Sequence, residues 1–489
     1  MKHKTFLITL VFTILTIDSI AQSNTMYYLT GVPHTYRLNP ATQPKCNFFF
    51  GIPVINSLYL ETYNSSFGLT DLIWNDPETN QVIHPLHPDA DLDAFFNKFN
   101  KDNTFSVDFA FSPISLGLRI RDMFFAFDIT TKIQGGLYYP GDFFPLILRG
   151  NQNQTTYDLS SLGLQINSYV EYALNVSRNF SDVLQVGIRP KFITGLGNIS
   201  SVDNNINLYT DVWEWPFDSK IELKVCTPGL YLPENEDGVF DPSGEFVYDS
   251  TLSGFSDYRK LFMKNRGLGI DLGVNFKPVE VLTLSASIID LGYIKWNDFV
   301  HTATLTGSLT YEGIEWNGAN DTATTNFLDH LLDTIKSNFE VTGSSEPYKT
   351  NLGPKLYLGA SLALLPSLDI GILSRIDFLN SGTKANVLIH ANWEPSTVFS
   401  LAATYSPFGG RASTFGLGFS LRGGPIAFYT VADYRAFRYN LYKYEKYPVF
   451  IAPNGRTRFN LQIGFNIMIG ANQRKRLMRD KPMYFSDES

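Results

Sequence analysis

The sequence predicts an all-β protein, a single transmembrane antiparallel β-barrel of about 14 strands with long extracellular loops. Three observations support this fold class. The apparent strands are long and alternate between apolar residues and small or polar ones. Their connections are short at one end and often long at the other. Aromatic residues make up 15% of the chain, yet no apolar run after residue 21 is long enough for a transmembrane helix.

Alternation is clearest in the last apparent strand, NLQIGFNIMIG, residues 460–470. Every second residue from Leu461 to Ile469 is apolar, so one face of this strand is wholly apolar. GLGIDLGVNF, residues 267–276, repeats the pattern. A half-buried strand of a soluble sandwich also alternates, but it usually holds about five or six residues, whereas a tilted membrane strand needs about 9–11. The polar faces here carry Gly, Ser and Asn rather than long charged side chains, which favours the membrane barrel.

Connections of two kinds alternate along the chain, as in bacterial outer-membrane barrels with short periplasmic turns and long extracellular loops. The short connections are residues 121–122, 178–182, 277–280, 365–368, 392–397 and 422–425; the others are 65–103, 135–165, 198–266, 294–354, 379–383, 406–412 and 434–455. The predicted strands are residues 46–64, 104–120, 123–134, 166–177, 183–197, 267–276, 281–293, 355–364, 369–378, 384–391, 398–405, 413–421, 426–433 and 456–470. An even number of strands places both ends of the barrel at the periplasmic rim.

The loops have structure of their own. Apolar side chains at helical spacing predict short amphipathic helices at residues 89–101 and 326–339. Residues 205–226 and 302–316 are predicted to be strands that continue beyond the membrane. Aromatic residues near the strand ends are predicted to form interfacial girdles. These residues are Tyr138, Tyr139, Tyr293, Trp296, Trp393, Tyr405 and Tyr434.

Residues 1–21 predict a secretory signal peptide, with a basic start, an apolar stretch over residues 5–17 and small residues at Ser19 and Ala21. We therefore expect cleavage near Ala21 and a location in the outer membrane of a Gram-negative bacterium. The mature chain divides into a leading segment, residues 22–45, a barrel, residues 46–470, and a periplasmic C-terminal tail, residues 471–489.

Several function classes are not expected. The net charge is −8 and there is no basic patch with interleaved aromatics, so nucleic acid is not an expected partner. There is no Gly-x-Ser-x-Gly motif, and we expect no enzymatic activity, no catalytic residue and no cofactor. Cys46 is expected near the periplasmic rim and Cys226 in an outer loop, so we expect no disulfide between them.

Two clusters contain residue types that can bind metals, but both are weak candidates for a metal site. His84, His87 and Asp89 lie close together, but prolines flank both histidines and nothing indicates groups that would orient them. Asp89, Asp91 and Asp93 begin like a calcium loop, but Ala94 replaces the required glycine and Asn100 the final glutamate. We expect no metal site.

Charged residues on the inward faces of the predicted strands are the better candidates for a site. A lipid-facing Arg or Lys near mid-membrane costs about 2–4 kcal/mol, so these side chains should face the lumen. Such charges either pair with one another as structural salt bridges or form a polar lining that guides a ligand. The lumen-lining candidates are Arg119, Asp128, Glu171, Arg189, Lys191, Asp271, Arg375, Asp377 and Arg422, together with Lys132 and Lys355.

Two stretches carry a resemblance to known barrels. YYLTGVPHTYRLNPATQPKCNFFFGIP, residues 27–53, and GLGIDLGVNFKPVEVLTLSASIIDLGYIKW, residues 267–296, resemble an uncharacterised family of outer-membrane barrels from Bacteroidota-type bacteria. That family is similar in appearance to FadL-like fatty-acid channels and to the PorV-like proteins of type IX secretion. The resemblance extends over the whole mature chain.

The resemblance implies an N-terminal plug. FadL-like channels carry an Asn-Pro-Ala segment that folds into the barrel as a hatch, and Asn39, Pro40 and Ala41 match it here. Residues 22–45, including Pro44, are therefore expected to close the periplasmic side. Proline lacks an N–H and asparagine can satisfy nearby backbone groups, so both suit a segment that lies in a lumen without joining the wall. A periplasmic leader that merely precedes the first strand would have similar loop chemistry.

The resemblance also implies a function: uptake or passage of a hydrophobic or amphipathic small molecule by a FadL-like barrel. The alternative, which the PorV-like relatives suggest, is a docking barrel that does not transport and that binds secreted or surface proteins through its extracellular loops. The expected partners are outer-membrane lipid together with a hydrophobic small-molecule ligand or a protein.

Overall fold

The computed structural model describes residues 25–470 with the exception of several internal segments. The exceptions are residues 30, 73, 76–81, 86, 88–89, 150–155, 202–203, 211–214, 232–246, 251–253, 255–256, 258–262, 312–338, 380–381, 407–413, 435–438, 445–446 and 454–457. The predicted signal peptide, the tail at 471–489 and the predicted helix at 326–339, apart from its last residue, therefore lie outside the described residues.

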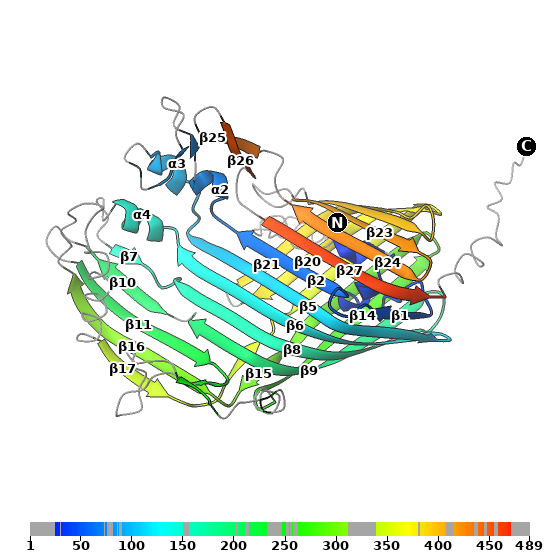
Figure 1. Ribbon diagram of the computed structural model, residues 1–489, viewed down its shortest axis with the longest axis horizontal. Coiled ribbons are helices and arrows are strands. Elements are labelled where there is room, and N and C mark those ends of the chain that lie inside the picture. The colour runs from blue at the N-terminus through cyan, green and yellow to red at the C-terminus, as the bar shows by residue number, and fades with distance from the viewer. Residues whose placement is uncertain are drawn as a thin grey trace, which may run out of the picture.

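A closed antiparallel barrel of 14 strands forms the body of the molecule, which confirms the predicted fold class (Figure 1). Each strand pairs with its neighbours along the chain, and the first of the fourteen is split into β1 and β2. The barrel strands are β1 (Phe48–Gly51), β2 (Ser57–Asn64), β5 (Asp102–Ile120), β6 (Met123–Pro140), β8 (Gly163–Asn179), β9 (Leu184–Ser201), β14 (Arg266–Val279), β15 (Leu282–Trp296), β19 (Lys355–Leu365), β20 (Leu368–Leu379), β21 (Gly382–Trp393), β22 (Phe399–Ser406), β23 (Thr414–Gly423), β24 (Ile426–Tyr434) and β27 (Arg458–Ile469).

The last strand closes the barrel against the first. In β27, Ile469 pairs with Phe48 of β1, and Ile463 pairs with Leu58 of β2. Closure leaves no sheet edge within the barrel, so backbone N–H and C=O groups are satisfied where lipid offers no partner. All fourteen predicted strands are present, although several run farther outward than predicted.

Apolar side chains cover the outside of this barrel. Ile372 is 53% exposed and Leu417 46%, and both lie in the middle part of their strands and face away from the lumen, as does Leu268 of β14, nearer the outer end, at 57%. Water would not favour so much exposed aliphatic surface, whereas hydrocarbon does. The protein is therefore an outer-membrane β-barrel. Among the described helices, none has the length and apolar character needed to cross a bilayer.

The first strand differs from the prediction at residues 52–56. Residues 46–64 were expected to form one strand, but the chain leaves the ladder between β1 and β2. Pro53 cannot donate to a ladder and Val54 has a positive φ of 73°, so both interrupt regular pairing. Inside the wall, the Asn56 side chain donates to the Ser112 carbonyl of β5 at 2.9 Å, while Ile52 and Ile55 stay hydrogen-bonded to Phe465 of β27.

One side of the barrel continues outward as a second part of the same sheet, seen at the left of Figure 1. The predicted strands at 205–226 and 302–316 are present here as β10 (Asn205–Tyr209), β11 (Trp215–Cys226) and β16 (Val300–Tyr311). The other outer strands are β7 (Thr156–Asp158), β17 (Phe339–Ser344) and β18 (Tyr348–Asn351). Three two-stranded hairpins are separate from this sheet: β3 (Trp74–Asn75) with β4 (Val82–Ile83), β12 (Leu230–Tyr231) with β13 (Val247–Tyr248), and β25 (Tyr439–Tyr444) with β26 (Tyr447–Pro453).

Short helices lie at the outer end of the strands. The helix predicted within residues 89–101 is present as α3 (Leu92–Phe96), where the Asp91 side chain accepts a hydrogen bond from the backbone N–H of Ala94 at 3.0 Å. The other helices are α2 (Leu69–Leu72) and α4 (Phe143–Arg149).

The predicted aromatic girdle is wrong for Trp296 and Tyr139. Trp296 is fully buried against the lumen side of the sheet, and its indole N–H donates to Thr350 at 2.9 Å. Tyr139 is also buried, with its hydroxyl 2.5 Å from the Ser66 hydroxyl. In contrast, Tyr293, Trp393 and Tyr405 are exposed on the outside, as interfacial residues should be.

The orientation of the wall can be tested with arginine on its outer face. Ile372→Arg should lower the free energy of unfolding in lipid by about 2–4 kcal/mol, because the side chain lies mid-strand facing hydrocarbon. Leu365→Arg, at the end of β19, is the control and should cost only about 0–1 kcal/mol. Urea unfolding in lipid vesicles measures both. Equal costs would contradict the proposed membrane position.

Candidate functional site

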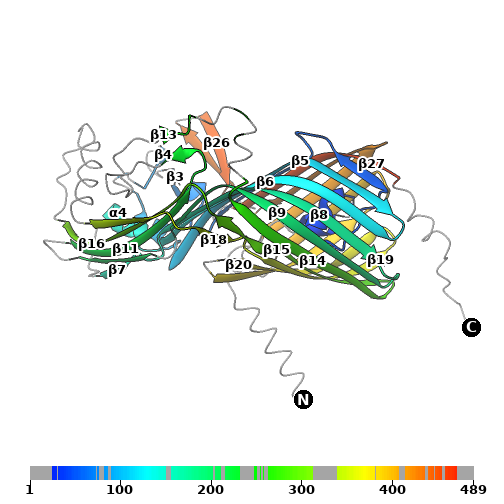
Figure 2. The same cartoon turned by 90° about the horizontal axis from the view of Figure 1, so that it is seen from below.

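The leading segment lies inside the barrel, as the dark blue ribbon in Figure 2 shows. Its described residues from Thr25 to Cys46 contain two 3₁₀ turns, η1 (Thr25–Tyr28) and η2 (Pro33–Arg37), and no strand. Tyr28 stacks on His390 of β21, with ring centroids 3.5 Å apart, and its hydroxyl donates to the Ile372 carbonyl. The segment is therefore held by side chains and turns rather than by a backbone ladder.

The Asn-Pro-Ala motif makes the contacts that its chemistry predicts. The Asn39 side-chain oxygen accepts a bond from the N–H of Ala41 at 3.0 Å, while its amide donates to Tyr27 and to Asn275 of β14. Asn175 of β8 donates to the Pro40 carbonyl at 3.3 Å. Arg119 of β5 donates to the carbonyl of Pro44, farther toward the periplasmic rim.

Two glycines of the wall make room for this motif. A Cβ on Gly187 of β9 would lie 2.1 Å from the Pro40 carbonyl oxygen. A Cβ on Gly273 of β14 would lie 2.2 Å from the Asn39 side-chain oxygen. No side chain fits at either position while the segment is in place, which explains why glycine occupies the polar face of these strands.

His34 anchors the segment at the break in the first strand. Its Nδ1 lies 3.1 Å from the Tyr429 hydroxyl and its Nε2 lies 2.9 Å from the Ser115 hydroxyl. Ser115 in turn donates to Asn56, and Tyr429 donates to Ser57. Complete burial and the nearby Arg37 charge hold the pKa of His34 well below its usual value, so the imidazole is neutral.

Arg37 connects the segment to a group of paired charges that we call the ion belt. Its Nε lies 3.0 Å from Asp128 of β6, and its Nη1 donates to Ser112 of β5 at 2.8 Å. Asp128 also accepts from Arg189 of β9 at 2.8 Å. The ion belt comprises Arg37, Asp128, Lys132, Glu171, Arg189, Lys191, Asp271, Asp290 and Lys355.

Most members of the ion belt have several partners. Arg189 contacts three carboxylates, and Lys191 lies 2.6 Å from Asp271 and 2.7 Å from Asp290. Asp290 also lies 3.0 Å from Lys355 of β19. Such pairing is what allows charges to be buried at all, because an unpaired charge would pay a large desolvation penalty.

Asp290 joins the belt through a β-bulge that simple alternation does not reveal. The register between β14 and β15 shifts around Asp271, and Asp290 has a φ of 58°. The bulge turns this side chain toward the lumen, and the backbone N–H of Asp290 donates to Asp271 at 2.7 Å. Aspartate tolerates this left-handed conformation better than most residues do.

A second charged group lies next to the belt. Arg375 and Asp377 of β20 pair at 2.9 Å, and Arg458 of β27 lies 3.1 Å from Glu61 of β2. The Tyr59 hydroxyl donates to the same glutamate at 2.5 Å.

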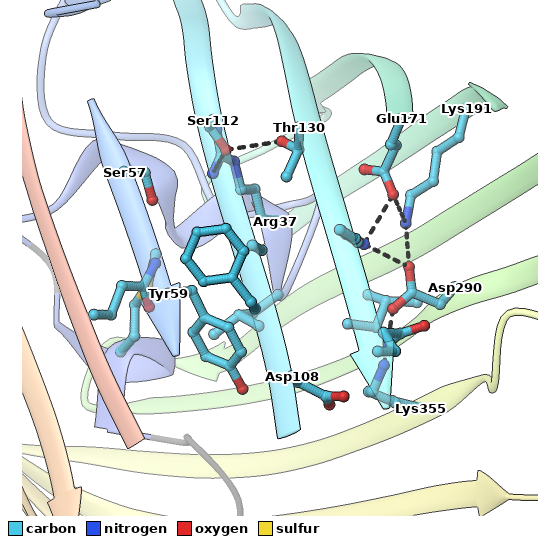
Figure 3. Close-up of a pocket in the computed structure, with 18 of the residues that line it drawn as sticks. Arg37, Ser57, Tyr59, Asp108, Ser112, Thr130, Glu171, Lys191, Asp290 and Lys355 are labelled. Carbon is cyan, nitrogen blue, oxygen red and sulfur yellow. Dashed lines mark hydrogen bonds and ion pairs between the residues drawn. The ribbon is translucent and has the colours of Figure 1, made fainter. Parts of the chain in front are cut away.

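A cavity of about 150 Å³ lies against the leading segment and is lined by members of the ion belt and by Arg375 of the second group (Figure 3). Met26, Arg37 and Leu38 of the segment line one side of it. The remaining lining comes from the wall and is mostly polar or charged: Ser57, Tyr59, Asp108, Phe109, Ala110, Ser112, Thr130, Lys132, Gln134, Glu171, Arg189, Lys191, Ile289, Asp290, Lys355, Tyr357, Arg375 and Gln462.

The sequence-based candidates divide into three positions. Glu171, Arg189, Lys191 and Arg375 line this cavity, as do Lys132 and Lys355. Asp128, Asp271 and Asp377 face the lumen and are paired with cavity residues. Arg119 and Arg422 lie apart from it near the periplasmic rim, where Arg422 donates to the Met468 carbonyl at 2.8 Å.

Sequence reasoning missed Arg37, Asp108 and Asp290 as cavity residues. Arg37 lies next to the Asn-Pro-Ala motif, but no strand pattern assigns it a direction. Asp108 lies beyond a register shift in β5 between Phe111 and Ile114, which reverses the faces counted from the periplasmic end. The signal that could have found the shift is Pro113, since proline within a strand often marks a bulge.

An aromatic cluster lies at the outer end of the barrel, between α2, α3 and α4. The centroids of Phe95 and Phe99 are 5.1 Å apart, and Phe144 lies 5.3 Å from Phe99 and 5.5 Å from Tyr139. Phe67 completes the cluster. It provides an apolar surface outside the charged lumen.

The remaining residues singled out in the sequence form no metal site in the described part of the chain. His84 and His87 are described, whereas Asp89 is not. Cys46 and Cys226 are both free thiols, and they are buried in different apolar clusters.

The family model of DUF5723, a family of unknown function, matches residues 40–433. The chain belongs to this family. The DUF5723 match begins at Pro40 of the Asn-Pro-Ala motif and ends in β24. No curated protein sequence matches the chain.

Solved structures give a distant likeness. A FadL homologue from Pseudomonas aeruginosa has a TM-score of 0.42 and 10% identity, covering 94% of this chain and 100% of that one. The toluene transporter TbuX of Ralstonia pickettii has a TM-score of 0.40 and 9% identity, covering 93% and 100%. The toluene transporter TodX of Pseudomonas putida has a TM-score of 0.39 and 8% identity, covering 92% and 95%. The strand pairing described above establishes the fold.

The close packing of the Asn-Pro-Ala motif against Gly273 predicts that adding a single methyl group there destabilises the protein. Gly273→Ala would place a Cβ against Asn39 and Ala41 and should destabilise the protein by about 1–3 kcal/mol, as overpacking does. It should also increase hydrogen exchange in residues 25–46, measured by mass spectrometry. Gly423→Ala is the control, because nothing lies within 4 Å of its Cβ. Unchanged exchange in Gly273→Ala would contradict this packing.

The ion belt predicts a large cost when one partner is removed. Arg189→Met leaves three buried carboxylates without their shared cation and should destabilise the protein by about 3–5 kcal/mol. Urea unfolding measures the change. Arg178→Met is the matched control, because its pair with Asp122 is largely exposed to solvent and should contribute little. Similar midpoints for both variants would show that the belt is not a cooperative network.

Proposed function

We propose that this outer-membrane barrel is a channel for a small amphipathic molecule and that residues 22–45 close it at rest as a plug. The observation that carries the proposal is how the segment is held. It fills the lumen through contacts such as Asn39 with Asn275, His34 with Ser115 and Arg37 with Asp128, and none of these is a strand ladder. A closure of this kind can leave the lumen without breaking the barrel.

The substrate is amphipathic because the path contains two environments. The aromatic cluster of Phe67, Phe95, Phe99, Tyr139 and Phe144 suits an apolar group at the outer end. The ion belt farther in would have to lose hydration against a purely apolar molecule, which is unfavourable. The Asn-Pro-Ala resemblance to FadL-like channels also supports a channel for an amphipathic molecule.

The domain boundaries follow from this proposal. We propose cleavage near Ala21, a plug at residues 22–45, a barrel at residues 46–470 and a periplasmic tail at residues 471–489. Two lumen-lining residues hold the plug: Asp128 pairs with Arg37, and Arg119 donates to the Pro44 carbonyl. Other lumen-lining charges line the cavity that the substrate enters.

Deletion of residues 24–42 tests the plug. The variant should show a larger single-channel conductance in planar bilayers than the intact barrel, because the lumen loses its filling. A heat-dependent shift in gel mobility would verify that the variant barrel is folded, and deletion of residues 472–489 is the control for a terminal truncation. A folded variant without increased conductance would contradict the plug.

A docking role is the second candidate, and the outer sheet favours it. Strands β10, β11 and β16 extend well beyond the barrel on one side and are regularly paired, with β11 matched to β16 from Trp215↔Tyr311 to Cys226↔Val300. Native mass spectrometry after mild extraction from outer membranes separates the two roles. A bound small molecule supports the channel, whereas a stoichiometric protein partner on an otherwise empty barrel supports docking.

A further inference from the structure

The central cavity has two chemically different sides. On the side formed by β8, β9, β14 and β15, Glu171, Arg189, Lys191 and Asp290 each have two or more oppositely charged partners. Their charges are already satisfied within the protein. A ligand gains little by contacting this side, because it would have to compete with ion pairs of 2.6–3.0 Å.

Away from that side Arg375 has donors to spare, and so has Arg37, which reaches the cavity from the leading segment and also pairs with Asp128 of the ion belt. Arg375 is only 4% exposed, and its Nε pairs with Asp377, but its terminal nitrogens have no hydrogen-bond partner among the described residues. Arg37 is bonded through Nη1 to Ser112, while its buried Nη2 has no partner in the described part of the protein. Both residues line the cavity. Guanidinium groups with free N–H donors bind carboxylates strongly.

The same cavity contains an acid with spare acceptors. Asp108 lines it from β5, and no described residue forms an ion pair or hydrogen bond with its carboxylate. Figure 3 shows Asp108 near Tyr59 and Lys355, at the edge of the open space. Tyr59 donates its hydroxyl proton to Glu61 and Lys355 pairs with Asp290, so neither is committed to Asp108. An ammonium group would satisfy this carboxylate.

From these unfilled positions we infer that the cavity binds the zwitterionic end of a small molecule, a carboxylate together with an ammonium group as in an amino acid. The carboxylate lies at Arg375 and Arg37, and the ammonium lies at Asp108. About 150 Å³ holds such a head group but not a long chain, which extends toward the outer aromatic cluster. This inference rests on the proposed channel function and names the polar end of its substrate.

Three matched probes test the inference by isothermal titration of the full-length mature protein in lipid nanodiscs, with empty nanodiscs subtracted. L-norleucine has both head groups, hexanoate lacks the ammonium, and pentylammonium lacks the carboxylate. Norleucine should bind at least tenfold more tightly than either of the others. Hexanoate binding as tightly as norleucine would overturn the inference in favour of a plain anion site, and pentylammonium doing so would overturn it in favour of an acidic site. The absence of norleucine binding would overturn it outright.

Single substitutions test which residue binds each end of the ligand. Arg375→Gln should lower the affinity for norleucine at least tenfold and leave the affinity for pentylammonium unchanged. Asp108→Asn should lower the affinity for norleucine at least tenfold and leave the affinity for hexanoate unchanged. Arg422→Gln, an inward arginine outside the cavity, is the matched control and should change norleucine affinity less than twofold. If a variant does not fold, the probe series on the unaltered protein still decides. Unchanged norleucine affinity in folded Arg375→Gln and Asp108→Asn would contradict the assigned site.

The binding measurement is independent of passage. Norleucine binding without increased conductance in the residue 24–42 deletion would contradict the channel and keep the site. Increased conductance without norleucine binding would keep the channel and contradict the zwitterion site.

Discussion

Closure of the backbone ladder is the constraint on which the rest of this structure depends. A chain that crosses hydrocarbon as strands must pair each strand on both sides, and β27 completes the ring by pairing with β1 and β2. Once the ring is closed, alternation sends every second side chain to lipid and the others to the lumen. The apolar exterior and the polar interior are therefore two consequences of one geometry.

An enclosed polar interior creates a second requirement, since its charges must find partners. The ion belt meets it with pairs between neighbouring strands, such as Arg189 with Asp271, and with pairs to the leading segment, such as Asp128 with Arg37. The segment is thus part of the electrostatic balance of the lumen as well as its filling. Any event that moves the segment outward also changes the partners of Asp128, so the position of the segment and the charge state of the cavity are coupled.

The wall departs from regularity where it meets the segment or the cavity. The break at residues 52–56 presents Asn56 to Ser115 and, through it, to His34. The bulge at Asp290 turns a carboxylate toward three lysines. The glycines at 187 and 273 leave room for the Asn-Pro-Ala motif. Irregular positions in this barrel are therefore the ones that shape its interior.

The sequence by itself determined the barrel. Alternation and the lengths of the connections were enough to predict all fourteen strands, the strands beyond the membrane and the inward direction of residues such as Arg189 and Asp271. These features are local, because the period of a strand is written in consecutive residues. The Asn-Pro-Ala resemblance pointed to the leading segment, but it did not indicate which wall residues would receive it.

Only the tertiary structure decided the composition of the cavity. Asp108 and Asp290 face it because register shifts in β5 and β15 change which side chains point inward, and a one-residue shift reverses a face. Arg37 reaches it because the leading segment folds back into the lumen. Trp296, which the sequence placed in the girdle, is buried for a related reason, since the sheet continues past the membrane and covers it. These outcomes depend on pairing between strands distant in sequence, which no local pattern records.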